Sequence, residues 1–113
     1  MDKNLSWDDF TKVDMRVGTV VEVRDFPKAH RPAYQLELDF GNDIGVLKTS
    51  AQVTKRYQKE DLLGMQLIAV VNFPKKQIAN FMSECLIIGV VGEDNDVSLL
   101  SPSLKTKNGL RVG

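Results

Sequence analysis

The stretch VDMRVGTVVEV at residues 13 to 23 decides the fold class of this chain. Its residues alternate, with Val13, Met15, Val17, Val21 and Val23 on one face and Asp14, Arg16, Glu22 and Arg24 on the other. A period of two predicts a long strand with one face towards a core. Gly18 lies in the middle, where a glycine often marks a bulge or the bend of a small barrel.

Further strands are predicted after this one. Residues 34 to 40 alternate again, and residues 46 to 49 follow a turn rich in Gly, Asn and Asp. The apolar runs 65 to 71 and 84 to 91 have strand length and are expected to be buried on both faces. A short strand is expected at 97 to 100.

Two helices are expected beside the strands. Ser6 precedes Trp7 and two aspartates, which predicts a short capped helix ending near Lys12. Residues 51 to 63, closed by Gly64, indicate a helix or helical turns between the third and fourth strands. We therefore predict an all-β fold, a five-stranded OB-fold barrel with that helix, the short N-terminal helix and a C-terminal extension.

Length and composition limit the organisation and the chemistry. We expect the 113 residues to form a single domain, 1–113. Cys85 in an apolar run and His30 in a loop are the only thiol and imidazole, so we expect no disulfide, metal, cofactor or catalytic pair. The polar N-terminus and the lack of a long apolar run predict a cytoplasmic protein with no membrane insertion.

The charge is balanced overall but unevenly distributed. Fifteen basic and fifteen acidic residues exclude a general basic excess, so a nucleic-acid site must be a local patch. Residues 44 to 83 carry a net charge of +4, from Lys48, Lys55, Arg56, Lys59, Lys75 and Lys76 against Glu60 and Asp61. Such asymmetry suits a phosphate-binding face, although Lys55, Arg56 and Lys59 equally suit the solvated side of a helix.

The loop expected at 72 to 83 carries the strongest functional signal. It has Lys75 and Lys76, no acidic residue, and a set of amide and hydroxyl groups on Asn72, Gln77, Asn80 and Ser83. Phe73 and Phe81 offer faces for stacking, or else pack the loop onto the barrel. Cations bind phosphates, whereas amides and aromatic rings bind unpaired bases.

Four motifs, in order, resemble the tRNA-binding OB domains and most closely the small CsaA proteins. They are KVDMRVGTVVEV at 12 to 23, PAYQLELDFG at 32 to 41, LKTSAQVTKRY at 47 to 57 and VVNFPKKQIANFMSECLIIG at 70 to 89. LLSP at 99 to 102 and NGLRVG at 108 to 113 also fit. Related domains are appended to bacterial methionyl-tRNA synthetases.

The resemblance implies a homodimer with a tRNA site on the open barrel face. The loop motif of the wider family falls on Asn72, Lys76 and Ser83. Asn80 stands where that family commonly has glycine, and we expect it to accept left-handed backbone geometry. Leu86 stands where methionine is frequent, a mild change.

Two functions follow. The first is a non-catalytic dimer that grips tRNA through Lys48, Lys55, Arg56, Lys75 and Lys76, with Asn72, Asn80 and Ser83 as polar contacts. The second, implied by the resemblance, is a chaperone for unfolded or precursor polypeptides that works with the secretion machinery. The chaperone needs exposed apolar surface, for which Trp7, Phe10, Phe26, Phe73 and Phe81 are the candidates.

Overall fold

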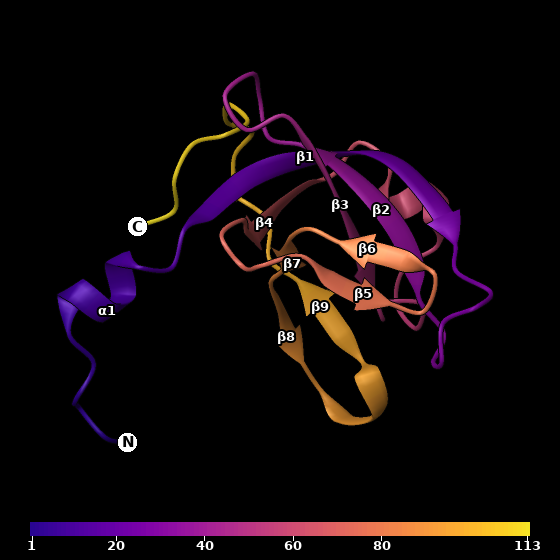
Figure 1. Ribbon diagram of the computed structural model, residues 1–113, viewed down its shortest axis with the longest axis horizontal. Coiled ribbons are helices and arrows are strands. Elements are labelled where there is room, and N and C mark those ends of the chain that lie inside the picture. Colours follow the sequence, from indigo (N-terminus) through magenta and orange to yellow (C-terminus); the bar gives the residue numbers. More distant parts are fainter.

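The predicted long strand forms β1 (Met15–Asp25), the centre of a five-stranded antiparallel sheet. The computed structural model describes residues 1–113. The strands follow the order β3-β2-β1-β4-β7, with β2 (Tyr34–Asp39), β3 (Val46–Ala51), β4 (Gln66–Val70) and β7 (Leu86–Ile87). Figure 1 shows the sheet curling so that its edges approach each other. The fold is a nearly closed, OB-like barrel, as predicted.

Side chains replace part of the backbone ladder where the barrel closes between β3 and β7. The Glu84 amide donates to the Lys48 carbonyl at 2.7 Å, and the Lys48 amide donates to Glu84 Oε1 at 2.9 Å. One residue along, Thr49 Oγ1 donates to the carbonyl of Cys85 at 2.8 Å. The buried polar groups at this seam are therefore satisfied, as a barrel interior requires.

The core lies inside the curled sheet and follows the predicted alternation in β2. Leu36 and Leu38 are completely buried, with Tyr34 and Phe40 on the same face. Gly18 is needed for this packing, because a Cβ there would lie 2.7 Å from Cε1 of Phe40. The glycine expected to mark a bend thus leaves room for an aromatic ring.

The predicted inward face of β1 was wrong at two positions. The pairing of β1 with β2 shifts between Val20 and Glu22, the signature of a β-bulge. The extra residue turns Val20 into the core and leaves Val21 exposed. Val13 is also exposed, since it precedes the first residue of the strand.

The first helix is as predicted, and the second is short. α1 (Trp7–Thr11) is capped by Ser6, which accepts a hydrogen bond from the Asp9 amide, as predicted. α2 covers only Lys59–Leu62 and is preceded by a turn at 54 to 56, so the segment expected at 51 to 63 forms helical turns and not one continuous helix. Residue 51 still pairs with β2, and the Tyr57 carbonyl accepts the Tyr34 hydroxyl at 2.8 Å. These tertiary bonds outweigh local helix propensity.

Two hairpins extend from the barrel. The loop expected at 72 to 83 contains β5 (Lys76–Ile78) and β6 (Phe81–Ser83). The other hairpin pairs β8 (Gly89–Val91) with β9 (Val97–Leu99) across the 3-10 turn η1 (Glu93–Asn95). The expectation that 84 to 91 is buried on both faces was wrong, because β7 ends after two residues and β8 projects outward with Val90 and Val91 exposed.

The C-terminal segment returns to β1 and bonds to its first half. Gly109 donates to the Val17 carbonyl at 2.8 Å, and Val112 donates to the Met15 carbonyl at 2.9 Å. The predicted C-terminal extension thus runs along β1 and is hydrogen-bonded to it. None of the helices has the length and apolar character that a membrane crossing requires.

Candidate nucleic-acid interface

The β5–β6 hairpin carries most of the residues that the sequence singled out. Ile78 pairs with Phe81, so Ala79 and Asn80 form a two-residue connection. The left-handed position is Ala79, with φ of 51°, and the expectation that Asn80 would take it was wrong. The tight turn is built one residue earlier than the family motif suggests.

An aromatic pair anchors the hairpin to the barrel. The ring centroids of Phe26 and Phe81 lie 5.5 Å apart, and Phe26 is buried, which excludes it as an exposed chaperone aromatic. The Lys48 ammonium lies 5.5 Å from the Phe81 centroid, within cation–π range. Lys48 is thereby held beside the hairpin.

The same aromatic pair brings in a loop that the sequence analysis left out of the site. Phe26 is at the start of the connection between β1 and β2, which carries exposed Lys28 and Arg31. In OB folds the loop between the first two strands and the loop after the fourth strand border the binding face. In the sequence, the only indication of this part of the site was the two cations Lys28 and Arg31 in a proline-flanked loop. Their relation to the hairpin is evident only from the fold.

The cations of the hairpin differ in their partners. Lys75 Nζ lies 3.5 Å from Glu84 Oε2, and its side chain is 67% exposed. Lys76 is exposed and, like Lys48, forms no ion pair. Because this contact is long and the Lys75 side chain is exposed, Lys75 remains able to exchange Glu84 for a phosphate.

Ser83 and Cys85 lie under the hairpin. Ser83 Oγ is half-buried, 3.2 Å from Thr49 Oγ1 and 3.3 Å from the Cys85 carbonyl oxygen, to which it donates. Burial raises the pKa of the Cys85 thiol to about 12, with the nearby Glu84 charge acting in the same direction. The prediction of a core cysteine is confirmed, since the thiol is buried and protonated at neutral pH.

Arg56 and Lys55 are directed to another part of the surface. Arg56 binds Asp96 through two hydrogen bonds, at 2.6 and 3.1 Å, in the turn between β8 and β9. The Arg56 guanidinium lowers the pKa of Asp96, and Lys55 contributes weakly from a distance. The structure has no hydrogen bond or ion pair between either cation and the β5–β6 hairpin.

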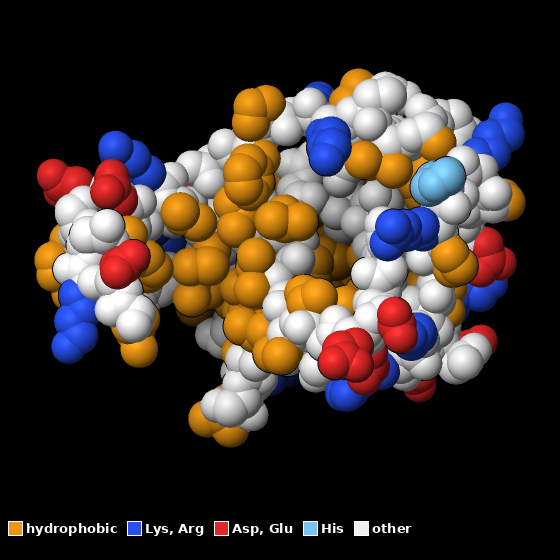
Figure 2. Space-filling view, turned by 90° about the horizontal axis from the view of Figure 1, so that it is seen from below, with side chains coloured by type: hydrophobic (Ala, Val, Ile, Leu, Met, Phe, Trp, Pro, Cys, Tyr) orange, Lys and Arg blue, Asp and Glu red, His pale blue; other side chains and the backbone are white.

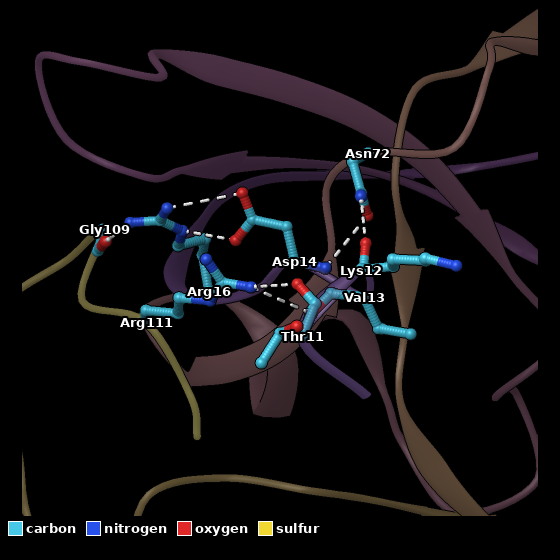
Figure 3. Close-up of polar contacts among 8 residues, drawn as sticks. All are labelled: Thr11, Lys12, Val13, Asp14, Arg16, Asn72, Gly109 and Arg111. Carbon is cyan, nitrogen blue, oxygen red and sulfur yellow. Dashed lines mark hydrogen bonds and ion pairs between the residues drawn. The ribbon is translucent and has the colours of Figure 1, made fainter. Parts of the chain in front are cut away.

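Asn72 joins the root of the N-terminal arm, residues 1 to 12, to the end of β4. Its side chain donates to the Lys12 carbonyl at 2.6 Å and accepts from the Asp14 amide at 3.0 Å. Figure 3 shows Arg111 on the other side of this root, with its guanidinium on the carbonyls of Thr11 and Val13. The amide that the motif suggests for RNA thus has partners in its own chain.

A second ion pair supports the same region. Arg16 binds both carboxylate oxygens of Asp14, at 2.6 and 3.3 Å, and also donates to the Gly109 carbonyl (Figure 3). The hydrogen bond from Arg16 lowers the pKa of Asp14. The arm root, β1 and the C-terminal segment are therefore linked through side chains.

A family model described as "Putative tRNA binding domain" matches residues 15–111. The chain belongs to this tRNA-binding domain family. Among its curated relatives are the methionine–tRNA ligases of Chlorobium phaeobacteroides, 33% identical over 108 residues, and Thermococcus onnurineus, 32% identical over 108 residues. Each match covers 96% of this chain but only 15% and 14% of the ligase, so the chain spans about one-seventh of those relatives.

Two solved structures match nearly the whole chain. The chaperone CsaA from Bacillus anthracis has a TM-score of 0.92 and 47% identity, covering 96% of this chain and 98% of its own. CsaA from Picrophilus torridus has a TM-score of 0.89 and 45% identity, covering 96% and 99%. The predicted resemblance to CsaA and to the synthetase domain is confirmed.

Proposed function

We propose that this chain is a tRNA-binding module that acts as a homodimer and performs no reaction of its own. The observation that carries the proposal is the family match across residues 15–111. The matched residues include the hairpin with Lys75 and Lys76, and Lys48, which lies over the ring of Phe81. Membership of the family supports tRNA as the partner. The cations supply the chemistry that phosphate binding needs.

The binding mode follows from the arrangement of charges. The cations of the hairpin and of the β1–β2 loop would bind successive phosphates, and Ser83 and Asn80 would contact sugars or base edges. Because the formal net charge of the chain is zero, attraction would be confined to this face. Shape, more than sequence, would select tRNA, and we expect the activity in the cytoplasm, where tRNA is used.

The experiment is a salt titration of tRNA binding with charge-matched variants. Lys75→Gln with Lys76→Gln removes two hairpin cations, whereas Lys105→Gln with Lys107→Gln removes two from the C-terminal segment. We expect the hairpin variant to weaken binding at least about tenfold and to lower the salt slope by about two, while the control changes little. Equal effects in both variants, or none in either, would refute the hairpin as the site.

The homodimer is supported by apolar surface that one chain leaves uncovered. α1 buries none of its residues, and Trp7 is 82% exposed. Val90, Val91 and Leu104 are exposed on the extensions of the barrel. Figure 2 shows apolar side chains gathered beside the arm on the side towards which β8 and β9 project. A second copy is the occupant that we propose for this surface.

A chaperone role is the second candidate. It is favoured by the two CsaA chaperone structures at 45–47% identity. We expect the protein to suppress aggregation of a thermally unfolded test enzyme at near-equal concentration. Suppression of aggregation that persists when tRNA saturates the protein would show that the peptide surface and the RNA face are separate. No suppression at a tenfold excess of the protein would refute the chaperone role.

A further inference from the structure

A hollow of about 340 Å³ opens next to the hairpin, between the end of β4 and β7. It is lined mainly by apolar atoms, from Phe73, Pro74, Cys85 and Leu86, with Lys76, Ser83 and Glu84 as the polar groups. Phe73 is 56% exposed and forms one wall. An exposed ring beside an apolar hollow is costly in water unless a flat partner covers it.

The polar groups of this hollow make a mixed set of acceptors and donors. Glu84 is only 18% exposed, and its Oε1 is occupied by the Lys48 amide. Its Oε2 faces the exposed Lys75 ammonium across 3.5 Å, a loose contact that leaves this oxygen able to accept further hydrogen bonds. Lys76 lines the same hollow as a donor without a carboxylate partner.

We propose that this hollow holds one unpaired guanine base of the bound RNA; the inference rests on the proposed tRNA-binding function and specifies what that site reads. The ring would stack on Phe73 and Leu86, where any base gains stacking energy. Glu84 Oε2, the oxygen that the Lys48 amide leaves free, would accept an N–H group from the pairing edge of guanine, which presents two of them side by side. Lys76 would donate to the guanine O6, an acceptor that adenine lacks.

The charges around the hollow favour a nucleotide over an apolar peptide side chain. Lys75 and Lys76 border it, and Lys48 lies over the neighbouring Phe81, so a phosphate on either side of the base would find a cation. A leucine or phenylalanine side chain would cover Phe73 but would bring no donor to Glu84 Oε2, which would then have only the long contact with Lys75. A buried carboxylate oxygen with so few donors is costly.

The test compares single-stranded ribonucleotide hexamers that differ in one base. Hexauridylate and a hexamer with one guanine replacing a uracil carry the same number of phosphates, so the electrostatic part is matched. We expect the guanine hexamer to bind at least about fivefold more tightly, and a hexamer with adenine at that position to fall between them. Equal affinities for the three would overturn the assignment.

Two variants test whether the guanine preference arises at this hollow. Phe73→Ala should weaken binding of every hexamer by about fivefold or more, whereas Leu63→Ala, another exposed apolar residue, should have little effect. Glu84→Gln keeps an acceptor for the Lys48 amide but loses the charge, so it should abolish the guanine preference without weakening hexauridylate. A loss of affinity for all hexamers in Glu84→Gln would indicate a purely structural role and contradict the proposal.

The same series separates this proposal from the one on which it rests. Failure of the unaltered protein to bind tRNA at low salt would refute the tRNA-binding function itself. Binding of tRNA that continues with no guanine preference, or displacement of the guanine hexamer by an apolar heptapeptide at equal concentration, would overturn the base pocket alone.

Discussion

Arg56 shows why a cation in the sequence is not always a cation at the site. Its partner Asp96 lies 40 residues away and is met only because the β8–β9 turn folds against the segment before α2. Counting charges along the chain placed Arg56 in the same basic segment as the hairpin lysines, although the solvated side of a helix was an equal alternative for Arg56. The hairpin lysines gather with Phe81 and Glu84, whereas Arg56 is engaged elsewhere. Which cations act together depends on tertiary pairing that no local pattern contains.

This ion pair predicts a pH dependence. Arg56 lowers the pKa of Asp96 from its ordinary 3.8, so the folded state gains stability above that value and loses it as pH falls through the lower folded pKa. We expect Arg56→Gln to raise the Asp96 pKa towards its ordinary value, as measured by NMR of the carboxyl carbon. The neighbouring change Lys55→Gln should shift it much less, and equal shifts would contradict the pairing.

Gly18 supports a prediction about packing. Gly18→Ala would place a Cβ 2.7 Å from the ring of the buried Phe40, so the ring or the strand must move. We expect a loss of about 1–3 kcal/mol in the free energy of unfolding, measured by chemical denaturation. Gly113→Ala, with no atom within 4 Å, serves as the control. An unchanged free energy of unfolding in Gly18→Ala would mean that the Phe40 ring can move aside without loss of stability.

At the scale of elements, periodicity identified the strands and failed where tertiary bonds decide. The barrel strands β1 to β4 were predicted because one buried face imposes a period of two on the sequence, or because burial on both faces produces an apolar run. The bulge at Val20 and Val21 was not predicted, since two consecutive valines are compatible with either strand register. The apolar residues of β8 resembled a buried strand, although they project from the barrel.

Asn72 connects the end of β4 to the N-terminal arm. Its two hydrogen bonds hold the chain between α1 and β1 against the end of β4. We expect Asn72→Ala to cost about 1 kcal/mol or more in stability and to speed proteolysis after Lys12 several-fold. The control Asn80→Ala, at the hairpin turn, should do neither. Unchanged proteolysis together with weaker tRNA binding would instead support Asn72 as a direct RNA contact.

At the scale of the molecule, the arm determines how two copies would meet. α1 stands away from the barrel in Figure 1 and buries nothing there, yet Asn72 and Arg111 fix its root in one direction. A fixed arm with exposed apolar side chains is suited to a second copy, because little ordering entropy is lost on docking. Two RNA faces held in one dimer would bind one tRNA with the advantage of effective concentration.

Trp7, the only tryptophan, makes this testable by fluorescence. We expect its emission to shift to shorter wavelength as the protein concentration rises. Over the same concentrations, the mass measured by light scattering should rise to about 25 kDa, twice the 12.7 kDa of one chain. Leu5→Ser should move the midpoint to at least tenfold higher concentration, since Leu5 is also exposed on the arm, whereas Leu63→Ser on the barrel should not. A single-chain mass at all concentrations would refute the dimer. A dimer unaffected by Leu5→Ser would place the interface away from the arm and leave α1 free for another partner.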